Sequence, residues 1–180
     1  TVNINFEFNE SYNGKAFLFD NKNLVPTVDG IRPNENVDVH LKNLKINKPF
    51  SNNTDNAIGF GFVSTGSDSN TFSGFWGVNI SDVVISGFNV VFDFKATNNG
   101  WLNGLQARNI KADHFVHFSR AYRETTSQGV TYNVFYGCDL QCRPETRDIF
   151  IETSDYQYRR SYTVADNLTI WDNHLHPNAK

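Results

Sequence analysis

Apolar and polar residues alternate over short stretches along most of the chain, and polar turn residues separate these stretches. Residues 90–94 and 115–118 are examples. In a strand, side chains two positions apart lie on one face, so this period predicts short strands with one face toward a core. The chain contains 16 phenylalanines and lacks long runs of helix-favouring residues at helical spacing. Since aromatic residues favour strands, the pattern predicts an all-β protein.

A short motif recurs along the chain: a polar turn residue, then an apolar, a variable and an apolar residue. It begins at Asn43, Asp82, Asn109, Asn133 and Asn167. The differences between these residue numbers are 39, 27, 24 and 34. They indicate a coil of about two dozen residues, with loops inserted into some turns. We therefore predict a short right-handed parallel β-helix, with a second strand per coil supplied by stretches such as residues 90–94.

In such a solenoid, equivalent residues of successive coils stack about 4.8 Å apart. The predicted buried column consists of Leu44, Val83, Ile110, Val134 and Leu168. The polar residues that begin each motif would form the preceding column, where amide side chains can hydrogen-bond along the stack and hold a bent backbone. We predict that this polar column is structural and has no catalytic role.

The length and composition fit a single domain. Residues 1–36 lack the motif but contain strand-like stretches, so we predict an N-terminal capping segment over 1–36 and the β-helix domain over 37–180. A cap would cover the core and strand edges at an open solenoid end. A β-sandwich is the alternative. It is less favoured because the Asn-Gly and Asp-Gly dipeptides, at 13–14, 29–30, 99–100 and 103–104, do not recur at the spacing of about 8–12 residues that successive hairpins would show.

Charge and cysteine content limit the partners of the protein. A net charge of −3 argues against nucleic acid or an anionic membrane as the main partner, because both require a basic surface. No apolar run approaches the roughly 20 residues that span a bilayer. Cys138 and Cys142 are interpreted as small core residues, with a disulfide closed by a turn as the alternative. The start at Thr1 and the absence of methionine suggest a processed or excised fragment.

The coils, written as Asn-Leu-x-Ile followed by a bend containing Gly or Asp, resemble the pectate-lyase-like parallel β-helix superfamily over roughly residues 37–176. Within it, short Asn- and Phe-rich domains are similar to phage tail-spike and tail-fibre modules. The resemblance implies a carbohydrate-recognition or structural module of a phage tail or cell-surface protein. It also implies a cell-surface polysaccharide partner, a homotrimer and a location on the virion tail or outside the cell. No cofactor is expected.

Two stretches carry candidate carbohydrate-binding residues. Trp76 and Trp101 stand near glycines, and aromatic rings stack on the C–H faces of sugars; the alternative is that both indoles plug loop bases against the core. Arg120, Tyr122 and Arg123 form the second group, in which guanidinium groups would bind carboxylates of an acidic polysaccharide. The alternative for this group is a solvated charged loop.

Asp113, His114 and Glu124 are candidate general acid and base groups. If they are catalytic, the protein is a polysaccharide lyase or a glycoside hydrolase, and the separation of the carboxyl groups would distinguish a retaining from an inverting hydrolase. No contiguous catalytic motif of these enzymes is present. The isolated clusters therefore favour a binding module over an enzyme. A metal site is not expected either, because the candidate ligands are predicted to lie too far apart for zinc.

Overall fold

The computed structural model of the chain describes residues 4–22, 35–37, 39–51, 56–65, 73–98, 100–123, 129–131, 133–154 and 163–171. Within these ranges the chain forms 17 β-strands and no helix. The prediction of an all-β protein is therefore confirmed for the described part of the chain.

The strands form three sheets, which we name A, B and C. Sheet A contains β1 (Ile4–Glu7), β4 (His40–Asn47), β7 (Asn79–Ser86), β10 (Gln106–Asp113), β13 (Asn133–Tyr136), β14 (Asp139–Gln141), β16 (Thr163–Asp166) and β17 (Thr169–Trp171). Sheet B contains β2 (Lys15–Lys22), β5 (Ile58–Thr65), β8 (Val90–Thr97), β11 (His117–Arg123) and β15 (Asp148–Ser154). Sheet C contains β3 (Glu35–Val37), β6 (Ser73–Trp76), β9 (Gly100–Asn103) and β12 (Gly129–Thr131).

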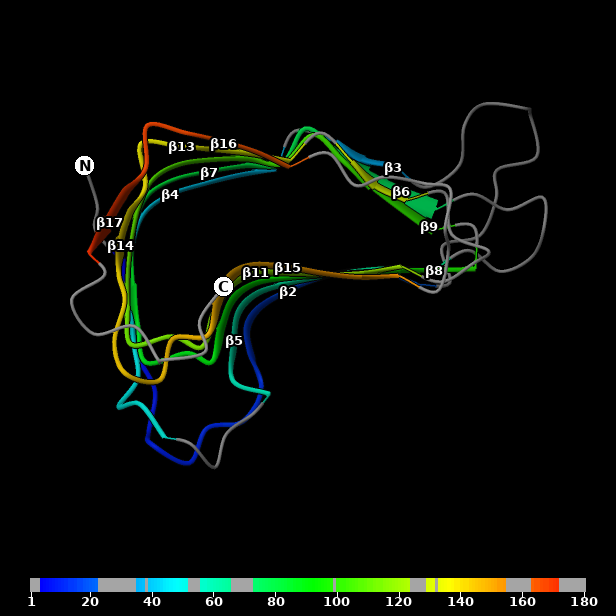
Figure 1. The fold of residues 1–180 in the computed structure, drawn as a ribbon. Helices are drawn as coiled ribbons and strands as arrows, with labels where there is room; N and C mark the ends of the chain where they lie inside the picture. Colours follow the sequence, from blue (N-terminus) through cyan, green and yellow to red (C-terminus); the bar gives the residue numbers. More distant parts are fainter. Residues whose placement is uncertain are drawn as a thin grey trace, which may run out of the picture.

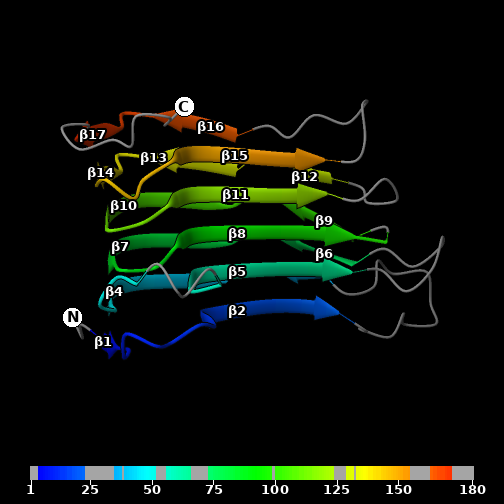
Figure 2. The same ribbon diagram turned by 60° about the horizontal axis from the view of Figure 1, so that its bottom comes forward.

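Every pairing between the described strands is parallel, and the chain visits sheets A, B and C in a recurring order. Viewed along the stack, the strands of each sheet superimpose, and sheet A is bent into two arms (Figure 1). Viewed from the side, β2, β5, β8, β11 and β15 follow one another as successive layers (Figure 2). This arrangement is compatible with a parallel β-helix. The third sheet was not expected from the sequence, because its strands have only three or four residues.

The bend between the two arms of sheet A falls on the predicted polar column. Asn43, Asp82, Asn109 and Asn167 have φ angles of 60°, 56°, 52° and 51°, which is the left-handed region. Asparagine and aspartate tolerate this conformation better than most residues. Asn109 Nδ2 also donates a hydrogen bond of 2.7 Å to Asp82 Oδ1 on the preceding coil. The predicted bend is confirmed at these four positions, and the predicted hydrogen bond along the column is confirmed between Asn109 and Asp82.

The predicted fourth member of each column is wrong by four residues. Val134 pairs with Gln106, whereas Lys111 pairs with Asp139, so Cys138 lies beside Ile110 and Gly137 takes the bend position with a φ of 62°. Asn133 is instead a strand residue with only 2% of its surface exposed. The physical reason is that the bend requires a positive φ, which glycine adopts without steric cost. Residues 133–136 fit the motif in sequence, although they lie before the actual bend at Gly137.

With Gly137 in the column, successive bends at 82, 109, 137 and 167 are 27, 28 and 30 residues apart, so the coil is longer than predicted. The apolar column becomes Leu44, Val83, Ile110, Cys138 and Leu168, of which the first four are buried and Leu168 is partly buried. Cys138 and Cys142 are both buried and neither is in a disulfide, which confirms their interpretation as core residues.

Replacing Gly137 with asparagine is expected to change the free energy of unfolding by less than about 1 kcal/mol, because asparagine already adopts this backbone elsewhere in the column. The Gly137→Val variant is expected to lose about 2 kcal/mol, since a β-branched residue is strongly disfavoured at positive φ. Urea unfolding of both variants measures the difference. Equal losses would show that the bend does not require this conformation in solution.

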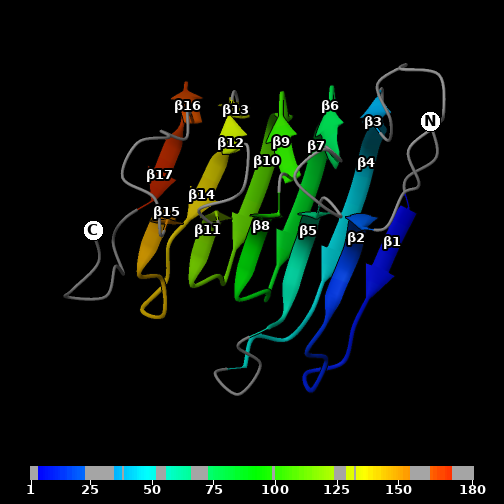
Figure 3. The same cartoon turned by 90° about the vertical axis from the view of Figure 1, so that its right-hand side faces the viewer.

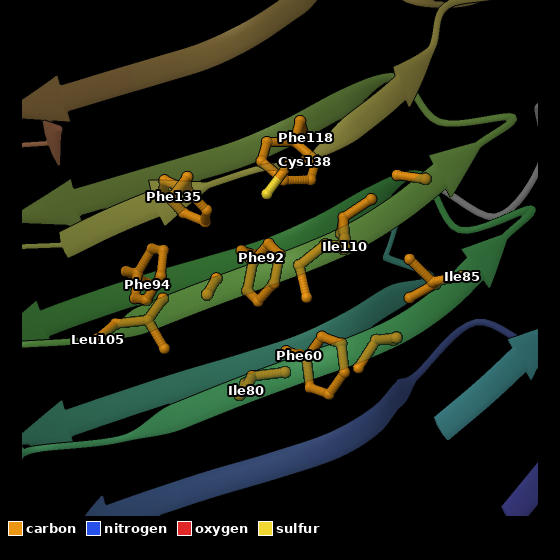
Figure 4. Packing of buried hydrophobic residues seen from close by; sticks show 14 of the residues in the cluster. Phe60, Ile80, Ile85, Phe92, Phe94, Leu105, Ile110, Phe118, Phe135 and Cys138 are labelled. Carbon is orange, nitrogen blue, oxygen red and sulfur yellow. The ribbon is translucent and has the colours of Figure 1, made fainter. Parts of the chain in front are cut away.

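Phenylalanine rings fill the space between the sheets. On sheet B, the Phe60 ring stacks on Phe92 at 5.2 Å between centroids, and Phe62 stacks on Phe94 at 5.0 Å. Phe118 and Phe135 then meet Phe92 edge-on from other strands. Figure 4 shows the rings of Phe60, Phe92, Phe94, Phe118 and Phe135 beside Ile80, Ile85 and Ile110 in one continuous core. The alternation in the sequence thus places one side of each strand in a shared apolar interior.

The N-terminal strands belong to the same ladders as the rest. β1 pairs with β4, β2 with β5 and β3 with β6, all in parallel. Ile4 pairs with Leu44 but is 48% exposed, because β1 is the edge strand of sheet A. The described residues before 37 therefore extend the three sheets by one layer. Whether they act as a cap, and whether a boundary lies at residue 36, stay predictions.

Candidate functional site

The candidate site lies at a corner where the chain passes from sheet A to sheet B. Strand β10 ends at Asp113, and His114 follows with a φ of 51°. One coil later, β14 ends at Gln141, which pairs with Asp113. The register therefore places the segment after Gln141 directly against the corner formed by Asp113 and His114.

An ion pair and a histidine–carboxylate contact connect the successive corners. Arg143 donates from Nε to Asp113 Oδ1 at 2.7 Å and from Nη2 to Asp113 Oδ2 at 3.1 Å, which is a bidentate pair. His114 Nδ1 lies 2.9 Å from Glu145 Oε1. The structure thus brings together two of the predicted catalytic residues, Asp113 and His114, and adds Arg143 and Glu145. Glu124, the third predicted catalytic residue, lies outside the described residues.

A tight turn holds Arg143 and Glu145 in place. Thr146 N donates to Arg143 O at 2.9 Å, and Arg143 N donates to Thr146 Oγ1 at 3.0 Å. The second turn position is Pro144, whose fixed φ suits it. The buried Thr146 hydroxyl also donates to Phe115 O on the earlier coil at 2.8 Å. Backbone and side-chain hydrogen bonds therefore fasten this turn to the preceding corner.

The Asp113 carboxyl is held in its ionised form. Partial burial by itself would raise the pKa of Asp113, but the hydrogen bonds from Arg143 and the nearby charges of His114 and Arg143 outweigh it and lower the pKa. The hydrogen bond from Arg143 to Asp113 likewise raises the pKa of the guanidinium. An ionised, arginine-paired carboxylate suits a base or a hydrogen-bond acceptor, whereas a general acid must carry a proton.

The His114 ring is 44% exposed and lies 6.3 Å from the Phe50 ring between centroids. Its contact with Glu145 uses Nδ1, so Nε2 is the nitrogen that can reach a ligand. A carboxylate that orients a histidine in this way is the arrangement of a general base and its positioning residue. The His114–Glu145 pair is therefore the feature of the corner most suited to proton transfer.

The Asp113–Arg143 pair predicts a pH-dependent contribution to stability. Because folding depresses the pKa of Asp113, the contribution is present above its unfolded value near 3.9 and is lost as the pH falls through the folded value. Asp113→Asn is expected to lose about 1 kcal/mol at pH 7, since both side chains are about a third exposed. The loss should shrink toward zero in acid.

Urea unfolding at pH 7 and at pH 3 measures this contribution. The double variant Asp113→Asn/Arg143→Gln isolates the coupling between the two side chains. A loss of stability from Asp113→Asn that is independent of pH would contradict the assignment, since it would come from packing and not from the charge.

An open groove on the outer face of sheet A borders this corner, and its space of about 530 Å³ includes open solvent. Its outward residues come from three neighbouring strands in two rows. The first row is Val84, Lys111 and Asp139, and the second is Ser86, Asp113 and Gln141. The backbone segments at Ile85 and Ala112 complete the lining. The groove thus presents an ammonium group, carboxylates, an amide and a hydroxyl side by side.

Arg120 and Tyr122 lie on the outer face of sheet B, away from the corner. Arg120 Nε contacts Asp93 Oδ1 at 2.7 Å, and Lys95 Nζ lies 5.8 Å from the centre of the Tyr122 ring. Both pairs join adjacent strands in register. The predicted group is therefore strand surface and not a loop at these two positions. Arg123 is the last residue of β11, but its side chain is outside the described part of the structure.

Trp76 and Trp101 lie in strands β6 and β9 of sheet C and not in loops. Trp101 is half-buried, whereas the Trp76 side chain is outside the described part of the structure. The predicted site residues are therefore distributed over three sheets. The groove residues Lys111, Asp139 and Gln141 were not predicted, because only the register between strands shows that they share a surface.

Comparison with known proteins adds no relative: no protein-family model, curated protein or solved structure matches the chain. The resemblance to the pectate-lyase-like superfamily is supported only by the parallel strands. In the described ranges, no group of three or more His, Cys, Asp or Glu residues is placed to hold a metal ion. In the same ranges, no helix is long and apolar enough to cross a membrane.

Proposed function

We propose that the three parallel sheets form one right-handed β-helix and that this rod carries a carbohydrate-recognition surface. The recurring order of the sheets, the parallel ladders and the stacked left-handed bends support a single solenoid. In this arrangement the N-terminal strands cap one end. The rod is a module of a phage tail or cell-surface protein, acts outside the cell and assembles as a trimer, as the resemblance of its coils implies.

The groove on the outer face of sheet A is the observation that carries this proposal. Sugar hydroxyls both donate and accept hydrogen bonds, and the groove offers donors on Lys111 and Gln141 beside the acceptors of Asp113 and Asp139. Neighbouring strands repeat these positions about every 4.8 Å. An extended polysaccharide along the stack would therefore meet polar groups at every coil.

The corner next to the groove favours binding over catalysis. The pair with Arg143 holds Asp113 in its ionised form, so this carboxyl group is not suited to donate a proton. The His114–Glu145 pair supports the second candidate function, in which His114 is the base of a polysaccharide lyase or glycoside hydrolase. The substrate of this enzyme would be a polysaccharide of the bacterial surface that binds in the groove.

Purified bacterial surface polysaccharides, both neutral and acidic, test these functions by retardation in affinity gels. We expect a polysaccharide in the gel to retard the wild-type protein. The affinity of Lys111→Ala and of Gln141→Ala is expected to be about tenfold weaker, which corresponds to about 1.4 kcal/mol each. Lys45→Ala is the matched control. Lys45 is exposed in the same outward row, where it pairs with Val84, but it does not line the groove.

New reducing ends or unsaturated uronates are measured in the same samples. Binding without these products supports a recognition module, and product formation that His114→Ala abolishes supports the enzyme. If none of the polysaccharides retards the protein or is cleaved by it, the carbohydrate proposal is wrong and the rod is a structural segment. Equal affinities of the Lys111→Ala and Lys45→Ala variants would place the binding surface outside the groove.

A further inference from the structure

We propose that Trp101 forms a second sugar contact, a flat stacking platform for a pyranose ring on the outer face of sheet C. This inference rests on the proposed carbohydrate recognition. It concerns a surface on a different sheet from the groove.

The register leaves Trp101 between two glycines. Trp101 of β9 pairs with Gly74 of β6 on one side and with Gly129 of β12 on the other. These three strands follow one another along the stack (Figure 3). Since glycine has no side chain, neither neighbouring position of the ladder presents a group beside the indole.

The indole lies across the backbone of Gly74. A Cβ atom at Gly74 would overlap the Cδ2, Cε2 and Cε3 atoms of Trp101. The ring is therefore folded down onto the adjacent strand and does not stand away from the sheet. Glycine within a strand weakens it and marks a close approach of another group, which here is the indole.

The platform faces outward. Phe75 and Leu102 are 2% and 3% exposed in the core, and they are paired with each other. Residues adjacent along a strand point to opposite faces, so Gly74 and Trp101 lie on the outer face. Trp101 is only half-buried, although Gly74 supports one side of its ring. A flat aromatic surface that faces outward suits the C–H face of a sugar ring.

Polar groups continue along the same coil beyond the platform. Gln106 and Arg108 follow on β10, where Arg108 Nη2 donates to Gln106 Oε1 at 2.8 Å. Arg108 is exposed and pairs with Tyr136, which is 47% exposed. An indole with amide, guanidinium and phenol groups beyond it matches a saccharide chain better than an apolar protein surface, which would need a wider hydrophobic patch.

The test compares Trp101→Ala, Trp101→Phe and Gly129→Val with the wild-type protein. It uses a polysaccharide that retards the wild-type protein in the affinity gels. We expect at least a tenfold loss of affinity for Trp101→Ala and partial recovery for Trp101→Phe. Gly129→Val places a branched side chain beside the indole and raises strand propensity. It is expected to weaken binding at least threefold without lowering the unfolding midpoint in urea.

A fluorescence measurement supports the same test. In the Trp76→Phe/Trp171→Phe variant, Trp101 is the remaining tryptophan, and its emission is expected to shift when the polysaccharide is added. If the Trp101 and Gly129 variants bind as tightly as wild type while Lys111→Ala binds weakly, the platform is wrong and the groove stands. If wild type binds no saccharide, both proposals fail.

Discussion

Phe92→Ala is expected to lower the free energy of unfolding by about 3–5 kcal/mol, the range for deleting a fully buried phenylalanine ring. Phe92 has no exposed surface. Its ring stacks on Phe60 at 5.2 Å and meets Phe118 and Phe135 edge-on at 5.4 Å and 5.3 Å. Because these partners come from other coils, the substitution removes contacts that join several layers of the stack.

Urea unfolding followed by intrinsic fluorescence and by circular dichroism measures this loss. In a stacked architecture each layer is stabilised mainly by its neighbours. A cavity in the middle of the stack should therefore also make the unfolding transition followed by fluorescence differ from the one followed by circular dichroism. Phe150→Ala is the control. Phe150 also contacts Phe118 and Phe135 but is 36% exposed at the edge strand β15, and a smaller loss is expected. Similar losses for both variants would contradict the central role of Phe92.

Gly87→Ala is expected to destabilise the protein by about 2–5 kcal/mol, which combines left-handed strain with overpacking. Gly87 has a φ of 83°, and a Cβ atom there would overlap the carbonyl group of Lys48. The backbone at Lys48 and Gly87 cannot easily move apart to make room for the added Cβ atom, because hydrogen bonds hold both segments. Lys48 N donates to Ser86 O at 3.0 Å, and Gly87 N donates to Asp113 O at 3.1 Å on the next coil.

Gly104→Ala provides the matched control for Gly87→Ala. Gly104 has a similar φ of 74°, but the nearest atom to an added Cβ is Gly77 N at 3.5 Å, an ordinary contact. This variant should lose only the strain of about 1–2 kcal/mol. The difference between the two unfolding free energies therefore measures the steric overlap between coils. If both variants lose the same amount, the corner at Gly87 relaxes without cost.

The sequence predicted only part of the candidate site. Asp113 and His114 were identified because acid and base residues stand together in the chain, but their partners Arg143 and Glu145 lie about 30 residues away. Arg120 and Tyr122 are close to His114 in sequence, yet the chain turns a corner at residue 114, and the two groups face outward from different sheets. Proximity along the chain therefore did not measure proximity in space.

The sequence alone determined the features that depend on local conformation. Alternating apolar residues specify strands, phenylalanine fills the interior, and Asn or Asp marks left-handed bends, because these preferences act within a few residues. The tertiary structure alone decided the register at Gly137, the existence of sheet C and the groove formed by Lys111, Asp139 and Gln141. Each depends on which strands become neighbours. Loops of unequal length change that pairing without altering the local pattern.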